Sequence, residues 1–299
     1  MPTPTKSRST LASVSEPDLA SMPDRVAPSV AVPPIIRLVE VHKSFPPQRV
    51  LDGINLVIPQ ARTTVVLGPS GCGKSVMLKL IIGLLRPDSG EVFFDGKRID
   101  NLRERDLRAV RLQIGLLFQM GALFDSMSVA ENIAFPLIEH TKLNPAERKK
   151  KIAQALATVD LDGVQEKLPA QLSGGQRKRV ALARAIVLEP RVVLYDEPTT
   201  GLDPIRADGI NDLIIKLKRT MGVTSIVVTH DLVSAKKVAD RVVMLLNGKV
   251  AADGTYEELE HSPDPRVQHF VAGQYDKDED EASNSPPPMR RTIEPEKRT

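Results

Sequence analysis

Several features are scarce in this 299-residue chain, and each scarcity excludes a class of protein. Cys72 is the single cysteine, which excludes an internal disulfide and favours a reducing compartment such as the cytoplasm. No apolar run approaches the roughly 18 residues that a membrane-spanning helix needs, so we do not expect an integral membrane protein. The 41 basic and 38 acidic residues nearly cancel, which argues against a nucleic-acid partner. Tryptophan is absent, yet 41% of the residues are hydrophobic, enough for the core of a globular protein.

Proline is concentrated at the two ends of the chain. Seven of the 24 prolines fall within residues 1–34 and four within 276–299. Segments of this composition bury too little apolar surface to fold, so we expect disorder over 1–34 and 275–299 on either side of one domain, 35–274. The first segment also lacks the continuous apolar stretch of a secretory signal, and we interpret it as a linker.

Between these ends, short β-branched runs alternate with helical patterns. The strand candidates are IIRLVEV, TTVVLG, EVFFDG, IGLLF, RVVLYDE, TSIVVTH and RVVMLLNGKV. The alternation predicts an α/β fold, with a buried and mostly parallel sheet flanked by helices. It is interrupted at about 120–188, where helical patterns follow one another without a strand. We therefore expect a helical lobe inserted into the α/β core.

A phosphate-binding loop is predicted at residues 68–75, GPSGCGKS, which match G-x-x-x-x-G-K-[ST] between a strand and a helical run. The glycines let the backbone aim several N–H groups at one anion, and the helix N-terminus adds about half a positive charge. We expect Lys74 to neutralise the β- and γ-phosphates of ATP and Ser75 to bind Mg²⁺. Cys72 occupies a variable position of the motif, so no redox role is expected. The predicted nucleotide contacts are Gly68, Pro69, Ser70, Gly71, Cys72, Gly73, Lys74, Ser75 and Val76.

Two acids end another strand candidate. Residues 191–198 read RVVLYDEP, in which an apolar run leads into Asp196 and Glu197. A carboxylate pair at the end of a buried strand is unfavourable unless it has a task. We expect Asp196 to hold Mg²⁺ and Glu197 to orient or deprotonate the water that attacks the γ-phosphate, which predicts an ATP-hydrolysing enzyme.

A second phosphate-binding pattern lies at residues 172–185, LSGGQRKRVALARA. A serine and paired glycines open a helix and can present N–H groups and a hydroxyl to a phosphate, but they have no lysine of their own. Such a site completes an anion pocket and does not hold a nucleotide alone. Together with the phosphate-binding loop and the DE strand, the run from LSGGQ through TTGLDP resembles the ATP-binding-cassette (ABC) ATPase family, over about residues 36–272.

The resemblance implies the ABC ATPase fold, a P-loop NTPase core with an antiparallel β subdomain and the helical lobe. It also implies a head-to-tail dimer with a second copy of the chain, because the signature of one subunit meets the γ-phosphate held by the P-loop of the other. The signature residues so implied are Ser173, Gly174, Gly175 and Gln176.

Four further positions take a role from the same resemblance. Phe45 aligns with the aromatic residue that stacks on adenine, although a packing role stays open. Gln119 aligns with the glutamine that senses Mg²⁺ and the attacking water and links to a membrane partner. Asp203 aligns with the loop at the dimer interface, and His230 with the histidine that touches the γ-phosphate. The implied Mg²⁺ ligands are thus Ser75, Gln119 and Asp196.

The single cassette, without a long coiled-coil insertion, favours a transporter subunit over a soluble DNA-repair or translation ATPase. Four segments resemble the Mla/Mce-type phospholipid-transport ATPases of bacteria. They are residues 118–140, 199–214, 224–255 and 262–273. An ATPase of importers for polar amino acids remains the alternative, because it shares every catalytic motif.

The Mla/Mce resemblance implies a peripheral location on the cytoplasmic face of the bacterial inner membrane. It further implies two partners besides the second copy, an integral membrane permease and an Mce-domain lipid-binding protein. A small STAS-domain regulator accompanies some of these systems, and the sequence leaves its presence open. Near Gln119 lie four apolar residues that we interpret mostly as core of the lobe, with some lining a groove for a permease helix. They are Leu123, Phe124, Met127 and Val129.

Overall fold

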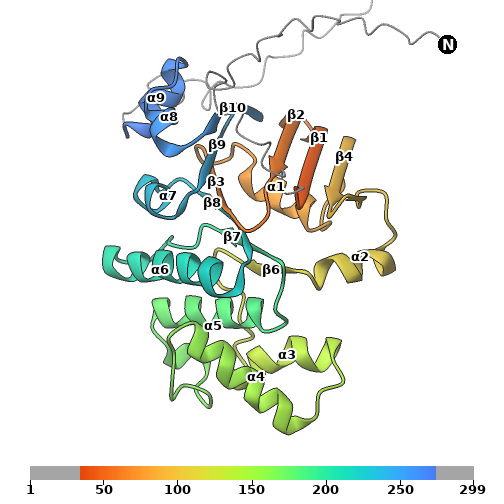
Figure 1. Ribbon diagram of the computed structural model, residues 1–299, viewed down its shortest axis with the longest axis vertical. Helices are drawn as coiled ribbons and strands as arrows, with labels where there is room; N and C mark the ends of the chain where they lie inside the picture. Colours follow the sequence, from red (N-terminus) through yellow and green to blue (C-terminus); the bar gives the residue numbers. More distant parts are fainter. Residues whose placement is uncertain (1–33, 274–299) are drawn as a thin grey trace, which may run out of the picture. The chain divides into compact units, whose positions relative to one another are not determined.

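The computed structural model describes residues 34–273. The predicted disordered ends, apart from Pro34, lie outside the described residues, and so does Gln274 at the end of the predicted domain. Within the described range the strands form two sheets (Figure 1). Eight helices of at least seven residues and two shorter helical segments accompany them there.

The smaller sheet is antiparallel and has the strand order β2-β1-β4-β5. Its strands are β1 (Ile36–Phe45), β2 (Gln48–Ile58), β4 (Ser89–Phe94) and β5 (Lys97–Arg98). The strand candidates IIRLVEV and EVFFDG therefore lie outside the mostly parallel sheet to which the alternation assigned them. They pair with each other in an antiparallel sheet, as the family resemblance implied. The first of them, β1, also pairs with β2, because a two-residue turn returns the chain beside β1.

Two details of the strand prediction were wrong. The strand β2 is absent from the candidates, because Asp52-Gly53 resembles a turn, whereas in the fold Gly53 takes φ 73° within a strand whose register against β1 shifts at irregularities. The run RVVMLLNGKV was predicted as one strand and forms two. Asn247 and Gly248 adopt φ 49° and 73° and turn the chain back, as Asn-Gly does in tight hairpins.

The larger sheet has the order β10-β9-β3-β8-β7-β6, in which all neighbours are parallel except β10 and β9. This confirms the predicted α/β fold with a mostly parallel sheet. Its strands are β3 (Thr63–Leu67), β6 (Ile114–Leu117), β7 (Val192–Asp196), β8 (Thr224–Thr229), β9 (Arg241–Leu246) and β10 (Lys249–Gly254).

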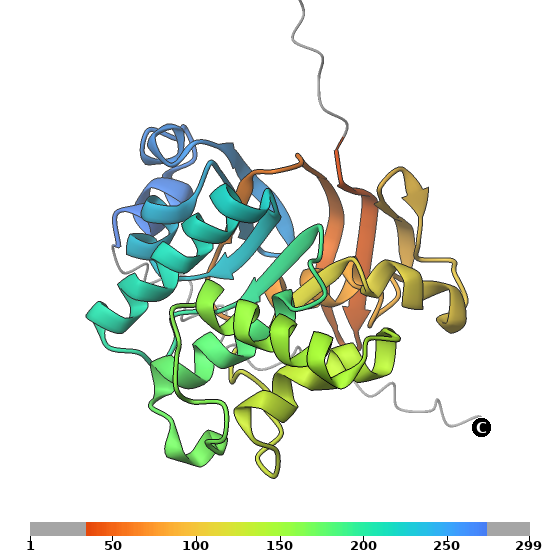
Figure 2. The same ribbon diagram turned by 60° about the horizontal axis from the view of Figure 1, so that its bottom comes forward.

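Three helices lie between β6 and β7, the segment in which a helical lobe is predicted. They are α3 (Val129–His140), α4 (Pro145–Thr158) and α5 (Gly174–Ile186), with a short 3-10 turn at Pro169–Gln171. Each begins at a capping box in which an Ser or Asn side chain and a Glu or Gln three residues later satisfy each other's backbone N–H groups. These helices come forward in Figure 2, in green tones.

The remaining helices are α1 (Lys74–Ile81), α2 (Glu104–Arg111), α6 (Pro204–Met221), α7 (Leu232–Val238), α8 (Tyr256–Glu260) and α9 (Pro265–Val271). Four of them connect strands, and the last two, α8 and α9, follow β10. Within residues 34–273, none of the helices has the length and apolar character needed to cross a bilayer.

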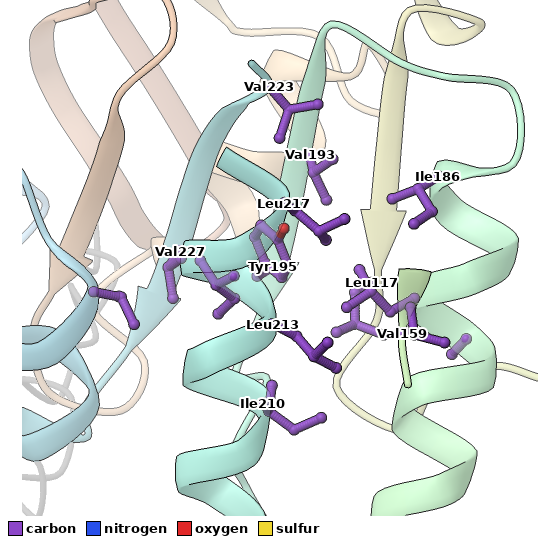
Figure 3. Close-up of a cluster of buried hydrophobic side chains, with 14 of the residues drawn as sticks. Leu117, Val159, Ile186, Val193, Tyr195, Ile210, Leu213, Leu217, Val223 and Val227 are labelled. Atoms are coloured by element: carbon purple, nitrogen blue, oxygen red, sulfur yellow. The ribbon is translucent and has the colours of Figure 1, made fainter. Parts of the chain in front are cut away.

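The core is divided by the larger sheet, and β7 shows how. Val193 and Tyr195 pack on one side, among residues of the helical lobe and α6 (Figure 3). Val192 and Leu194 pack on the other, against α1 and the antiparallel sheet. Because successive side chains of a strand point to opposite faces, a continuous apolar run covers both sides and leaves only its carboxyl end polar.

Candidate nucleotide-binding site

The predicted site residues gather where three neighbouring parallel strands end. Leu67 at the end of β3 pairs with Thr229 at the end of β8, and Asp196 at the end of β7 pairs with Val228. The segments that follow these strands therefore leave one edge of the sheet together. Ligands of such folds bind at the carboxyl ends of the strands.

The P-loop connects β3 to α1, and two of its glycines are required by geometry. A Cβ at Gly68 would lie 2.4 Å from the carbonyl oxygen of Leu245. Gly73 adopts φ 104° at the N-cap of α1 and supplies no side-chain cap, so no capping side chain covers the first N–H groups of the helix. The Lys74 Nζ donates to the carbonyl oxygens of Gly68 and Pro69 at 2.7 and 2.9 Å. This leaves a concave, N–H-rich loop suited to a phosphate chain.

A pocket of about 350 Å³ adjoins the loop. Ten residues line it, nine of which were predicted to act on the nucleotide. They are Val50, Ser70, Gly71, Gly73, Lys74, Ser75, Val76, Gln119, Glu197 and His230. Val50, the unpredicted member, comes from β2. Pro69 and the buried Cys72 belong to the loop and do not line this pocket.

The hydroxyl of Ser75 and the carboxylate of Asp196 provide a magnesium-type pair of ligands. The Ser75 Oγ donates to Asp196 Oδ1 at 2.8 Å. Both are hard oxygen ligands, which suits Mg²⁺. Among the described residues no cluster of three or more His, Cys, Asp or Glu side chains could hold a metal. The pair thus fits an ion that shares its coordination with phosphate oxygens and water.

Glu197 is buried and held from every side. Its backbone has φ 47°, in the left-handed region, and its N–H donates to the Val228 carbonyl oxygen at 3.0 Å. Hydroxyls of Thr229 and Thr200 donate to Oε2 at 3.2 and 3.4 Å, and His230 Nδ1 lies 3.0 Å from Oε1. A left-handed conformation at a non-glycine residue is unfavourable and is typical of functional positions. The carboxylate is thus fixed at the pocket wall, with an acceptor oxygen beside the P-loop.

A hydrogen-bonded network surrounds Asp231, the residue that follows His230. Asp231 accepts from the Thr199 hydroxyl at 3.1 Å, from Ser234 Oγ at 2.5 Å and from the first N–H groups of α7, while Asn211 donates to Ser234. Burial raises the pKa of Asp231, but these hydrogen bonds outweigh it and hold the pKa below its ordinary value. The N–H of Asp231 also donates to Thr229 Oγ1, so the network reaches the hydroxyl that holds Glu197. None of these groups was predicted. Thr199, Asp231 and Ser234 lie within a few residues of Glu197 or His230, which is the available signal, whereas Asn211 on α6 carries no such signal.

Lys178, on α5, is also absent from the predicted site. Its Nζ donates to the backbone carbonyl oxygen of Gln119 and, at 3.4 Å, to that of Glu197. The helical spacing that puts it on the buried face of α5 with Gly175 and Leu182 is the signal that reveals it.

The signature residues lie apart from this pocket. Ser173 caps α5: its Oγ accepts from Gln176 N at 3.3 Å, and its N–H donates to Gln176 Oε1 at 3.0 Å. Asp203 caps α6 by accepting from Arg206 N at 3.0 Å. Neither the signature residues nor Asp203 line the P-loop pocket. The two predicted phosphate-binding patterns are therefore separate within one chain.

Phe45 likewise lies outside the pocket lining. It ends β1, its ring is 45% exposed, and the ammonium of Lys43 lies 5.4 Å from the ring centroid. Phe45 is therefore not one of the buried core residues. Its stacking on adenine stays a prediction.

Comparison with known proteins gives a consistent set of relatives. A family model described as "ABC transporter" matches residues 51–200. The intermembrane phospholipid transport system ATP-binding protein MlaF of Escherichia coli K12 is 42% identical over 224 residues, 75% of this chain and 83% of MlaF. MlaF of Haemophilus influenzae is 43% identical over 76% of this chain and 86% of its own length.

A relative from Mycobacterium tuberculosis H37Rv, named a probable ribonucleotide transport ATP-binding protein, is 43% identical over 77% of this chain. The chain spans 64% of the length of that relative. Among solved structures, the dimeric post-hydrolysis state of the ATP-binding cassette MJ0796 bound to ADP and Pi is 34% identical, with a TM-score of 0.68 over 74% of this chain and 98% of that one.

Proposed function

This chain belongs to the ABC transporter family of ATP-binding proteins, and from that premise we propose that it is the ATP-hydrolysing subunit of a bacterial phospholipid transporter. The observation that carries the proposal is the convergence of Lys74, Ser75, Glu197 and His230 on one pocket at the carboxyl end of the sheet. The substrate class is supported by the MlaF relatives.

The hydrolytic step follows from the positions of the side chains. The P-loop N–H groups and Lys74 bind the phosphates, and Ser75, Asp196 and Gln119 are the residues that would hold Mg²⁺, which supplies neutralising charge when bound. Glu197 accepts a proton from the attacking water or orients it. His230, which contacts Glu197 and has a half-exposed side chain, is placed to donate toward the γ-phosphate.

Two copies of the chain are required by this proposal. The signature residues stand outside the P-loop pocket of their own chain, so they can complete only the pocket of another. The solved dimeric structure of the MJ0796 cassette supports this arrangement, since that cassette is 34% identical over 74% of this chain. Closure would then bring charge-assisted hydrogen bonds to each phosphate, and hydrolysis would remove them.

An exposed apolar patch beside Gln119 supports a membrane-protein partner. Its residues are Phe118, Met120, Phe124, Phe135 and Ile138, from 38% to 88% exposed. Next to it lies a cavity of about 600 Å³ lined by α2, β6, α3 and α5. Exposed apolar surface of this kind marks an interaction site, and we assign it to a cytoplasmic helix of the permease.

The four apolar residues noted near Gln119 divide between core and this patch. Val129 is fully buried, and the partly buried Leu123 packs against the same core. Phe124 is 42% exposed and packs at a tilt against Phe135, with ring centroids 5.1 Å apart. Met127 is partly exposed. The exposure of Phe124 supports its assignment to the proposed groove, whereas Val129 belongs to the core of the lobe.

Affinity capture of the tagged chain from bacterial membranes, followed by reconstitution, tests the proposal. We expect the complex to contain a permease and an Mce-domain lipid-binding protein, at the cytoplasmic face of the inner membrane, and to move a fluorescent phospholipid when ATP is supplied. The same complex with Lys74→Ala is the control. If a receptor for polar amino acids is captured instead, the substrate is a polar amino acid and not a phospholipid. If no permease is captured, the chain is a soluble ATPase. A STAS-domain protein would appear in the same capture.

A further inference from the structure

The side chain of Lys178 occupies an unusual place for a lysine. It lies on the buried face of α5 and is 7% exposed. Its neighbours along that face are apolar or glycine: Gly175, Ala181, Leu182 and Ile186. An ammonium group in such surroundings loses hydration, and a methionine of similar length would avoid that loss. The lysine is therefore best explained by what its nitrogen touches.

The Nζ of Lys178 reaches two loops of the nucleotide pocket. It donates to the carbonyl oxygen of Gln119 and, at 3.4 Å, to that of Glu197. The Glu197 carbonyl also accepts from Thr200 N at 3.3 Å. Burial lowers the pKa of Lys178, while Asp196 and Glu197 oppose that shift. Lys178 thus holds the backbone on both sides of the pocket.

The contact to Glu197 acts on a strained residue. With φ 47°, its backbone depends on surrounding hydrogen bonds to keep its conformation. Three groups supply them: Val228 accepts from its N–H, and Thr200 and Lys178 donate to its carbonyl oxygen. A small displacement of Lys178 would therefore re-aim the Glu197 carboxylate and shift the Gln119 loop.

The signature lies at the start of the same helix, one turn before Lys178. Ser173 to Gln176 form the N-cap and first turn of α5, and Lys178 lies in the following turn. Resting on the proposed head-to-tail dimer, the first turn would meet the nucleotide of the partner, whereas Lys178 contacts the site of its own chain. One rigid helix of 13 residues thus joins two different nucleotide sites.

We propose that Lys178 is a positioning residue that couples the two ATP sites of the dimer. Binding of ATP in the partner's P-loop would pull on the first turn of α5, and Lys178 would pass this displacement to Gln119 and Glu197 of its own chain. Such coupling is reciprocal between equal sites, so it appears as cooperative hydrolysis.

The test measures ATP hydrolysis by the purified full-length chain over a range of ATP concentrations. Lys178→Met keeps the packing and removes the donor, and Lys178→Arg keeps a charged donor. The matched control is Arg179→Met, on the same helix, which removes a cation that donates to the Val159 carbonyl oxygen at 2.8 Å, outside the pocket. Binding of a fluorescent ATP analogue and the melting temperature are measured for each variant.

We expect a parental Hill coefficient above about 1.5 and a value near about 1 for Lys178→Met, with kcat lowered about tenfold. ATP-analogue binding should stay within about twofold, because Lys74 and the P-loop are untouched. Lys178→Arg should recover most of the cooperativity, and Arg179→Met should resemble the parent.

Four results would overturn the coupling. They are a non-cooperative parent, a Lys178→Met variant with parental kcat and Hill coefficient, failure of Lys178→Arg to recover cooperativity, and an Arg179→Met variant with the same loss. In each case the parent still hydrolyses ATP and the proposed function stands, whereas a parent without ATPase activity contradicts that function itself. If Lys178→Met melts at a much lower temperature, Lys178→Gln carries the same comparison with a shorter, uncharged side chain.

Discussion

The N-termini of α1 and α5 are alike in composition and opposite in how their N–H groups are satisfied. Both contain glycine and serine. The helix α1 begins with Lys74 and Ser75, and α5 begins with Gly174 and Gly175. At α1 the N-cap is Gly73, in a left-handed conformation and without a capping side chain. At α5 the N-cap is Ser173, closed in a capping box with Gln176.

This difference shows which of the two helix N-termini lies at a pocket of its own chain. The α1 end has uncapped donors, a lysine, a Ser75–Asp196 pair and the fixed Glu197 around one cavity. The α5 end is capped by its own side chains and lines no part of that cavity. A self-satisfied helix start is stable alone, and we expect it to serve a ligand brought by another molecule. Four experiments test the contrast, beginning with the largest effect.

ATP hydrolysis should depend on Glu197 in the pocket at the N-terminus of α1. In Glu197→Gln the shape of the pocket is kept while the proton acceptor is lost, so kcat should fall about 10² to 10⁴-fold with ATP still bound. A closed dimer should accumulate and can be measured by light scattering with ATP. Hydrolysis at the parental rate would remove Glu197 from its assigned role.

The N-terminus of α1 in one subunit and that of α5 in the other should form one ATP site. A mixed dimer of Lys74→Ala and Ser173→Arg subunits keeps one intact composite site, formed by the P-loop of the second and the signature of the first. We expect labelled ATP to be trapped at that site, at about half the amount held by two intact sites, and not by either variant alone. If the mixed dimer traps none, the head-to-tail arrangement is wrong.

A glycine-to-alanine substitution should lower the free energy of unfolding more at the N-terminus of α1 than at that of α5. At Gly73 a Cβ would lie 2.6 Å from Leu51 Cδ2 at φ 104°, so Gly73→Ala should lose about 1 to 3 kcal/mol of unfolding free energy. At Gly174 the nearest atom is Leu202 Cδ2 at 3.5 Å, and the free energy of unfolding should change by less than about 1 kcal/mol. Urea unfolding measures both. Gly174→Ala should nonetheless weaken ATP-driven dimerisation, and equal destabilisation of the two variants would contradict the contrast.

The smallest effect concerns the cap itself. Ser173→Ala should lose about 1 kcal/mol of unfolding free energy through the open capping box. Ser128→Ala is the matched control, because Ser128 forms the same box at α3, outside the P-loop pocket lining. Both should lower the urea midpoint alike, but only Ser173→Ala should reduce the ATPase rate. A reduced rate in Ser128→Ala as well would attribute the effect to the stability of the lobe.

Much of this site could be predicted because its parts are contiguous in sequence. GPSGCGKS contains the glycines, the lysine and the serine of one loop, and RVVLYDEP places two acids at a strand end. The unpredicted residues make contacts across large sequence separations. Lys178 meets the carbonyl of Gln119 59 residues away, and Val50 reaches the pocket through β2, whose Asp52-Gly53 looks like a turn.

The sequence by itself determined the α/β class, the P-loop, the two acids at the end of β7, and a signature without a lysine. Local spacing suffices for these, because backbone turns and helix starts depend on neighbouring residues. Only the tertiary structure decided that the P-loop, Glu197 and His230 share one pocket while Ser173 stands outside it. Strand order and the packing of α5 bring distant segments together, and no local pattern encodes that distance.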